Sequence, residues 1–400
     1  MRRRQALAVV LGLVVTTFGT VTPAAADDKE TLVERIVGKA DPELLEVLVT
    51  TRGEGGAPRF QTIKVPDVAA AKRVVGSKLG RSGVLAVEMN RRVSTGANDP
   101  LFRNQWALDS RHFYFDRVNS VTRNDQSRPY VAVVDSGVQS GHTDLAGRVG
   151  TGYDAFGGGS TADACGHGTH VAGIIAATAN NYRGVAGLAP RAYIRPVKVL
   201  RWEGGLLGGG DCVGYSSTVA AGITWAADHA HIINLSIEAL SPSDAERIAV
   251  NYARSRGRAV IAAAGNSGDG VVVYPAGYSG VIGVGAVARS NSYPYWTQAG
   301  FSNPGSWVDV AAPGVDIVST VPPSNRTCSE YPSAGSGYCF LSGTSMATPY
   351  VAATVALGVQ HCRWSTSTAL VAMQRTASHY PKKFSKVGYG VVNPLRVLQC

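Results

Sequence analysis

The amino-acid sequence predicts an α/β protein with a doubly wound parallel sheet, preceded by a small α+β domain. After residue 97, short apolar runs alternate with longer stretches of helical periodicity. This alternation is typical of a parallel sheet with helices on both faces, because strands buried on both sides are apolar throughout. The composition agrees with a globular chain, since hydrophobic residues make up 45% and charged residues 16% of the 400 positions.

The first 26 residues are expected to be a signal peptide for export. Residues 2–4 are arginines, residues 6–21 are mostly apolar, and residues 24–26 are alanines of the kind that precede a cleavage site. A membrane anchor is the alternative, but the apolar stretch is shorter than the ~20 residues that a span requires. No later apolar stretch is long enough either. We therefore expect a secreted, extracellular protein without a membrane anchor.

Residues 27–97 are predicted to form the small α+β domain. Residues 44–51 and 84–93 have the composition of strands, and residues 68–79 have the periodicity of an amphipathic helix. A domain of this size buries too little apolar surface for robust stability on its own. Residues 94–97 are small or polar, which is typical of an exposed joint that proteases cut.

Residues 98–400 are predicted to form the second domain, with the parallel sheet at its centre. The predicted strands are four apolar runs, at 130–134, 192–200, 231–237 and 259–264. The predicted helices are 167–179, 216–230, 243–255, 344–357 and 365–377. In such sheets functional groups gather at the carboxyl ends of the strands. Polar residues that follow a strand or open a helix are therefore the candidates for a site.

Charge and cysteine content exclude two classes of function. The formal net charge is +10, but residues 98–400 hold 23 basic and 18 acidic residues without a basic stripe, so no nucleic-acid partner is expected. The six cysteines fit an oxidising compartment. Their even number allows fifteen pairings, and spacing alone does not choose among them. A zinc site is not expected, because no CxxC motif occurs.

Three candidate residues lie where such a sheet places its chemistry. Asp135 follows the predicted strand 130–134, where a buried carboxylate needs a partner for its charge; a turn-forming aspartate is the alternative. His167 opens a predicted helix within GHGTH, which lacks the glutamate of a zinc-protease helix; a structural histidine is the alternative. Ser345 begins another predicted helix, where an N-cap role is the alternative. Together the three supply a serine nucleophile and a histidine base held by a carboxylate.

Four sequence blocks resemble the subtilisin family of serine proteases, including its thermitase-like and proteinase K-like members. VAVVDSGV (131–138), GHGTHVAG (166–173) and SGTSMATP (342–349) are similar to the three active-site blocks, in the family's order Asp, His, Ser. AAAGNSG (262–268) resembles the block that carries the oxyanion-hole asparagine. The resemblance implies Ser345 as nucleophile, His167 as general base and then acid, and Asp135 orienting the imidazole. It implies that Asn266 stabilises the oxyanion.

The resemblance also implies a substrate cleft, with two departures from the family pattern. Glu238 stands where the block ISLSLGG has a glycine, and Val273 stands where the floor of the primary specificity pocket often has one. Val273 predicts a preference for small or medium apolar side chains at the cleaved position. The residues implied to bind substrate are Ser236, Ile237, Glu238, Ala263, Gly265 and Val273.

A calcium ion is the one cofactor that the resemblance implies. Three segments resemble those that build the strong calcium site of thermitase-like members. They would supply hard oxygen donors of the kind that Ca²⁺ takes; ordinary turns and an Asn-rich loop are the alternative. The implied ligands are the side chains of Asp99, Asp144 and Asn181 and the carbonyl groups of Thr178, Arg183 and Val185.

Residues 42–93 loosely resemble the family's inhibitory propeptide, and a spacer is the alternative. We therefore expect a signal peptide over 1–26, an inhibitory and chaperone propeptide over 27–97, and a peptidase domain over 98–400. Near-neighbour cysteines are expected to pair, as Cys165–Cys212, Cys328–Cys339 and Cys362–Cys400.

The resemblance thus implies a secreted, monomeric serine endopeptidase that hydrolyses proteins and processes its own pro-form. Its partners would be protein and peptide substrates and its own propeptide as inhibitor. One alternative is a dedicated processing protease with a single protein target. The other is a catalytically silent binding protein on the same scaffold, against which the intact Asp135, His167, Asn266 and Ser345 argue.

Overall fold

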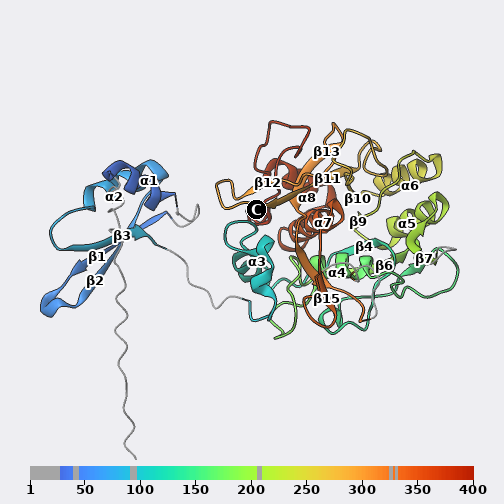
Figure 1. The fold of residues 1–400 in the computed structure, drawn as a ribbon, viewed down its shortest axis with the longest axis horizontal. Helices are drawn as coiled ribbons and strands as arrows, with labels where there is room; N and C mark the ends of the chain where they lie inside the picture. The colour runs from blue at the N-terminus through green and yellow to red at the C-terminus, as the bar shows by residue number, and fades with distance from the viewer. Residues whose placement is uncertain (1–27, 39–44, 91–96, 205–209, 324–327, 329–331) are drawn as a thin grey trace, which may run out of the picture. The chain divides into compact units, whose positions relative to one another are not determined.

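The computed structural model describes residues 28–38, 45–90, 97–204, 210–323, 328 and 332–400. The chain divides into two compact units, with the boundary after Ser94 (Figure 1). The expected signal peptide, most of the expected joint at 94–97 and residues 205–209 lie outside the described residues.

The first unit is a three-stranded antiparallel sheet with two helices. The strands β1 (Glu46–Arg52), β2 (Pro58–Lys64) and β3 (Val84–Met89) lie in the order β2-β1-β3. The helices are α1 (Lys29–Val37) and α2 (Val68–Lys78). Val47, Val49 and Val87 of the sheet pack with Val37 and Val75 of the helices in one apolar core. The described parts of the predicted strands and the predicted helix are confirmed, whereas α1 and β2 were not predicted.

The second unit is built on an eight-stranded sheet in the order β12-β11-β10-β9-β4-β6-β5, with β13 also beside β11. All of these pairings are parallel except that of β11 with β12, which confirms the predicted sheet. The strands are β4 (Tyr130–Asp135), β5 (Tyr153–Asp154), β6 (Tyr193–Lys198), β9 (Ile232–Leu235), β10 (Ala259–Ala263), β11 (Ile282–Arg289), β12 (Trp296–Gln298) and β13 (Val308–Pro313).

Helices cover both faces of this sheet (Figure 1). Alternate residues of β4 belong to two different cores: Val131 and Val133 pack with α3, α4, α7 and α8, and Ala132 and Val134 pack with α5 and α6. This is the doubly wound arrangement that the sequence predicts. The helices are α3 (Phe115–Thr122), α4 (His167–Ala176), α5 (Ser216–His229), α6 (Asp244–Ser255), α7 (Thr344–His361), α8 (Thr366–Arg375) and α9 (Pro394–Val397).

Short elements and disulfides complete the unit. Two hairpins lie outside the large sheet, β7 (Leu200–Gly204) with β8 (Gly210–Gly214) and β14 (Ile317–Thr320) with β15 (Tyr338–Leu341). Single 3₁₀ turns occur in this unit at Phe102–Asn104, Trp106–Leu108 and Thr143–Leu145, and in the first unit at Glu54–Gly56. The three expected disulfides, Cys165–Cys212, Cys328–Cys339 and Cys362–Cys400, are present.

Helix α7 is the central helix of this unit. Every side chain from Met346 to Gly358 is buried, so the helix is apolar on all sides and lies within the core. Ser345 is the second residue of α7 and lies at its half-buried N-terminal end. In the described part of the chain, no helix has both the length and the apolar character needed to cross a membrane.

Candidate functional site

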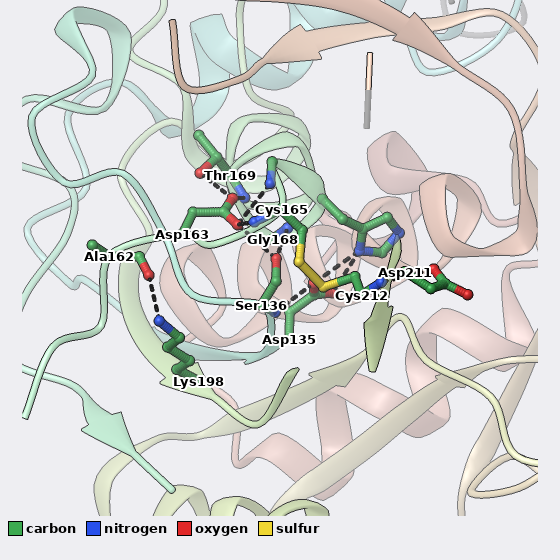
Figure 2. Close-up of a disulfide and its surroundings, with 12 residues drawn as sticks. Asp135, Ser136, Ala162, Asp163, Cys165, Gly168, Thr169, Lys198, Asp211 and Cys212 are labelled. Carbon is green, nitrogen blue, oxygen red and sulfur yellow. Dashed lines mark hydrogen bonds and ion pairs between the residues drawn. A yellow bond between two sulfur atoms is a disulfide. The ribbon is translucent and has the colours of Figure 1, made fainter. Parts of the chain in front are cut away.

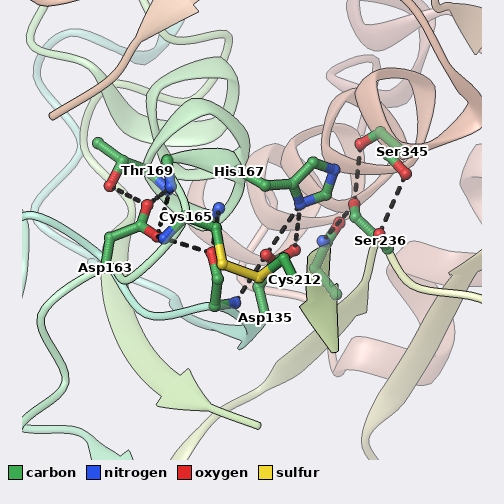
Figure 3. Close-up of polar contacts among 12 residues, drawn as sticks. Asp135, Asp163, Cys165, His167, Thr169, Cys212, Ser236 and Ser345 are labelled. Atoms are coloured by element: carbon green, nitrogen blue, oxygen red, sulfur yellow. Dashed lines mark hydrogen bonds and ion pairs between the residues drawn. A yellow bond between two sulfur atoms is a disulfide. The ribbon is translucent and has the colours of Figure 1, made fainter. Parts of the chain in front are cut away.

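Asp135 and His167 form a close pair at the carboxyl end of β4. Asp135 is the last residue of β4 and is fully buried. His167 is the first residue of α4, and its Nδ1 lies 2.8 Å and 2.9 Å from the two carboxylate oxygens of Asp135 (Figure 3). The N–H of Ser136 donates to Asp135 Oδ1 at 2.7 Å. The buried carboxylate therefore has the partners that its charge requires, and it fixes the direction of the imidazole.

The electrostatic environment favours a protonated His167. Burial by itself lowers the pKa of His167, but the charge of Asp135 and its hydrogen bond, together with the charge of Asp163, raise that pKa above the ordinary histidine value of 6.5. His170, one turn later in α4, behaves differently, because burial lowers its pKa to about 3 and keeps it neutral. Of the two histidines in GHGTH, only His167 thus has an environment that favours taking up a proton.

Ser345 faces this pair from the start of α7. Figure 3 shows the His167 ring between Asp135 and Ser345, with its side away from Asp135 directed towards the serine. The Ser345 hydroxyl donates to the backbone carbonyl of Ser236 at 3.0 Å, and the Ser236 hydroxyl donates to the Ser345 carbonyl at 2.8 Å. These two bonds fasten the start of α7 to the chain just beyond β9.

Asn266 lies beside the same helix start. Its amide oxygen accepts the N–H of Thr344 at 2.8 Å and the Thr344 hydroxyl at 3.0 Å. With the oxygen held in this way, the amide N–H groups remain for a ligand. Gly265 precedes Asn266 with φ of +108°, and a Cβ there would lie 2.4 Å from Asn303 Nδ2, so only glycine fits this turn.

The residues expected to bind substrate come together around this centre. The segments that contain Ser236 and Val273 are joined by a backbone bridge, in which Ala239 and Tyr274 exchange two hydrogen bonds of 2.8 Å and 2.9 Å. Val273 is buried, and one of its methyl groups lies 3.1 Å from the position of a Cβ on Gly265. Ile237 is partly buried and Ala263 ends β10.

Glu238 is an exposed residue, yet its carboxylate interacts with the backbone of Asn266. Partial desolvation raises the pKa of Glu238, and a hydrogen bond from the backbone N–H of Asn266 opposes that shift. A negative charge therefore lies next to the residue expected to stabilise the oxyanion, where the family pattern places a glycine.

The residues expected to bind calcium also come together. Asp99 and Asp144 are both buried. Burial raises the pKa of both carboxyl groups, and the charge of Asp144 contributes to the shift at Asp99. Asp99 accepts the N–H groups of Asn180 and Asn181 at 2.9 Å and 3.0 Å, and Asp144 accepts the side-chain amide of Asn181 at 2.7 Å.

Oxygen donors are available at this position. Within the described residues, no hydrogen-bond donor reaches the carbonyl oxygens of Thr178, Arg183 and Val185. The described ranges also contain no cluster of three or more His, Cys, Asp and Glu side chains that could hold a metal. A cation here would therefore depend on two carboxylates supplemented by amide and backbone oxygens, which is a donor set that suits Ca²⁺.

Comparison with known proteins gives the family. Residues 126–390 match the model of the subtilase family of peptidases, a span that contains Asp135, His167, Asn266 and Ser345. The chain belongs to the subtilase family. It is a subtilisin-like serine endopeptidase with the subtilisin α/β fold.

Relatives of this subtilase include thermophilic and keratin-degrading enzymes. It is 36% identical over 347 residues to a thermophilic serine proteinase of Bacillus sp. strain AK1, covering 84% of this chain and 77% of the relative. It is 41% identical over 271 residues to thermitase of Thermoactinomyces vulgaris, covering 67% and 88%. Fervidolysin of Fervidobacterium pennivorans, a keratinolytic enzyme, matches with a TM-score of 0.63 and 28% identity, covering 93% of this chain and 59% of fervidolysin.

Two polar residues of the subtilase site escaped the sequence reasoning. Thr344 orients the Asn266 amide, and Asp163 accepts several hydrogen bonds in the loop before His167. Thr344 lies next to Ser345 within the block 342–349, so the sequence alone could have indicated that it belongs to the site. Asp163 lies in a stretch without regular periodicity, and its hydrogen-bond partners are known only from the three-dimensional structure.

Proposed function

We propose that this subtilase is an exported protease, made as a pre-pro-enzyme, with Asp135, His167 and Ser345 as its catalytic triad. The observation that carries the proposal is the close contact of His167 Nδ1 with both oxygens of Asp135, on the side of the ring away from Ser345 (Figure 3). A carboxylate in this position selects the tautomer in which Nε2 is free to accept a proton.

The proposed reaction begins when the Ser345 hydroxyl turns from the Ser236 carbonyl towards His167. Ser345 Oγ attacks the carbonyl carbon of the scissile peptide bond while His167 Nε2 takes its proton. Asp135 stabilises the imidazolium, and the Asn266 amide and the Ser345 N–H donate to the oxyanion. His167 then returns the proton to the leaving amine, and the C–N bond breaks to leave an acyl-enzyme. Water, deprotonated by His167, hydrolyses the ester and restores Ser345.

Substrate would bind along the segments at Ser236, Ile237 and Glu238 and at Ala263 and Gly265. In this proposal Val273 closes the floor of the pocket for the side chain before the cleaved bond. Removing or adding one methylene in such a pocket changes discrimination by about 1–3 kcal/mol. The buried position of Val273 beside Gly265 supports a preference for small or medium apolar side chains.

The first unit is proposed to be the inhibitory and chaperone propeptide, within the domain bounds 27–97. Both the AK1 proteinase match, over 84% of the chain, and the fervidolysin match, over 93%, are longer than residues 95–400. Each match therefore includes part of the first unit. A propeptide removed by Ser345 and a signal peptide over 1–26 would yield a secreted, monomeric mature enzyme that starts near Asn98.

Calcium is proposed to bind at Asp99 and Asp144. The Asn181 side chain would join them after its amide turns to present oxygen, together with the carbonyl groups of Thr178, Arg183 and Val185. When bound, the ion supplies positive charge to two buried carboxylates, which would otherwise repel each other. Its proposed role is to stabilise the loops around α4, without part in the chemical step.

Replacing Ser345 by alanine tests the function. The Ser345→Ala chain should accumulate as an unprocessed precursor that starts near Asp27 and lacks peptidase activity, since loss of a triad residue costs about 10⁶-fold in turnover. The matched control is Ser255→Ala, at the exposed end of α6, which should mature normally. Processed, active Ser345→Ala protein would contradict the assignment.

Two further measurements separate the alternatives. A fluorophosphonate probe should label the native enzyme and not Ser345→Ala; a silent binding protein would remain unlabelled in both forms. Digestion of a peptide library distinguishes a broad protease, which cleaves many sequences, from a processing protease with a single target.

A further inference from the structure

The carboxylate of Asp163 organises the loop that leads into α4 (Figure 2). Its Oδ1 accepts the N–H groups of Cys165 at 3.0 Å and Gly166 at 2.8 Å. Its Oδ2 accepts the N–H of Thr169 at 2.8 Å and the Thr169 hydroxyl at 2.5 Å. The N-cap position of α4 is Gly166, which has no side chain to accept a bond. Asp163 therefore supplies the acceptor that the first turn of α4 would otherwise lack.

The same carboxylate also reaches the end of β4. The hydroxyl of Ser136, the residue after Asp135, donates to Asp163 Oδ1 at 2.7 Å and accepts the N–H of Gly168 at 3.0 Å. Ser136 is fully buried, so these bonds are shielded from water. Both neighbours of His167 are thus connected to Asp163, Gly166 directly and Gly168 through Ser136. The strand end that carries Asp135 and the helix start that carries His167 share one anchor (Figure 3).

Titratable groups around His167 come from β4, the loop before α4, α4 itself, β6 and β8. Asp135 lies on β4, Asp163 on the loop and His170 on α4, and the charges of both carboxylates raise the pKa of His167 against the effect of its burial. His170 is neutral because its own pKa is lowered to about 3. Lys198 of β6 donates to the Ala162 carbonyl at 3.2 Å, and Asp211 of β8 accepts the N–H of Cys212 at 2.7 Å. Asp163 is thus a second negative charge acting on the imidazole.

We propose that Asp163 is a positioning residue of the Asp135–His167 pair, which holds the end of β4 and the start of α4 in the register that the proton transfer needs. The proposal depends on the function proposed above for Asp135, His167 and Ser345. Without this anchor the catalytic groups remain but their mutual direction loosens, and a misplacement of about 1 Å costs up to about 10²-fold in rate. The charge of Asp163 also favours the imidazolium that forms while Ser345 attacks.

The first test compares two isosteric variants of the full chain. Asp163→Asn removes the negative charge and replaces one of the two hydrogen-bond-accepting oxygens by an NH₂ group. Asp154→Asn is the matched control, because Asp154 also accepts loop N–H groups, from Phe156 at 3.0 Å and Ser160 at 3.3 Å. In Asp163→Asn we expect kcat to fall by about tenfold or more, KM to change by less than about threefold, and the acid limb of kcat/KM to move to lower pH. Asp154→Asn should leave all three within about twofold of the native enzyme.

The second test does not require activity or self-processing. In full-length Ser345→Ala protein, the titration of His167 is followed by NMR of ¹⁵N-labelled histidine and assigned with a His167→Gln variant. Adding Asp163→Asn should move this titration to lower pH, and adding Asp154→Asn should not. If Asp163→Asn does not fold, Ser136→Ala removes only the link between Asp163 and Gly168 and should lower kcat without changing KM.

The outcomes separate this proposal from the proposed function. Native kcat in Asp163→Asn overturns the positioning role. Reduced kcat with an unshifted His167 titration and a lowered melting temperature also overturns it, because that result shows a purely structural role. Full peptidase activity in Ser345→Ala with a His167 titration that still responds to Asp163 would refute the proposed function and leave the link between Asp163 and His167 standing.

Discussion

Removing the Cys165–Cys212 disulfide should lower both the stability of residues 95–400 and the turnover of the enzyme. This bridge closes a separation of 47 residues, for which chain entropy predicts a loss of about 4 kcal/mol in the free energy of unfolding. Cys165 is also two residues before His167 and donates its N–H to Asp163. Replacing both cysteines by alanine therefore frees the loop that positions His167, so kcat should fall as well.

The Cys362–Cys400 disulfide provides a control of matched size. Its separation of 38 residues predicts a loss that is only about 0.2 kcal/mol smaller. Cys362, however, follows the end of α7, and the 18 residues of that helix place it about 25 Å from Ser345. The double alanine variant of this pair should lose similar stability and keep its kcat.

Stability is measured by denaturant unfolding in the Ser345→Ala background, which prevents self-digestion. All six tryptophans lie between Trp106 and Trp364, so fluorescence reports on the second unit alone. Turnover is measured on the active chains and normalised to the sites titrated by a fluorophosphonate. Equal losses of kcat in the two disulfide variants would refute the reasoning, as would a loss of stability well below 1 kcal/mol for Cys165–Cys212.

Three more predictions follow from the site. Chelator should lower the melting temperature measured by calorimetry. If calcium was present at a hundred times its Kd, the loss in the free energy of unfolding should be about 2.7 kcal/mol. Asp144→Ala should remove most of this sensitivity to chelator. Since burial raises the pKa of Asp99 and Asp144, protonation protects the metal-free fold at low pH, so the chelator effect should grow as pH rises through those values; equal effects at all pH would contradict this. Val273→Gly should raise the kcat/KM ratio for Phe over Ala at the cleaved position by about tenfold or more in matched peptides, and an unchanged ratio would place the pocket floor elsewhere. The acid limb of kcat/KM should lie above 6.5, because neutral His167 is the base and the charge of Asp135 raises its pKa against the effect of burial; a limb below 6.5 would show that burial outweighs the charge of Asp135.

The predicted elements that the structure confirms are those whose sequence signal is local. β4, α4 and the start of α7 have apolar periodicity that follows from burial of the same residues, so pattern and structure agree. The run 192–200 was predicted as one strand, but β6 ends at Lys198 and β7 begins at Leu200. Strand β2 was not predicted because nearly all of its residues are exposed, which leaves no alternation to detect.

The site divides in the same way. Four residues each lie within a short block of consecutive residues that the sequence shows directly, and the fold brings the blocks together: Asp135, His167, Asn266 and Ser345. The role of Asp163 depends on Ser136, 27 residues away in sequence, and on backbone groups of a loop whose shape no periodicity specifies. Contacts of this kind depend on the tertiary packing of β4 against α4, which the local sequence pattern does not specify.

The burial of α7 has a consequence for how this enzyme can change over evolutionary time. The helix that carries Ser345 is enclosed from Met346 to Gly358, so most substitutions there remove packing and threaten folding before they alter chemistry. Variation in specificity must therefore come from the surrounding segments, such as those that contain Ile237 and the exposed Glu238. A mutational library restricted to those segments should yield many folded enzymes with new preferences, whereas one of equal size within α7 should yield few folded proteins.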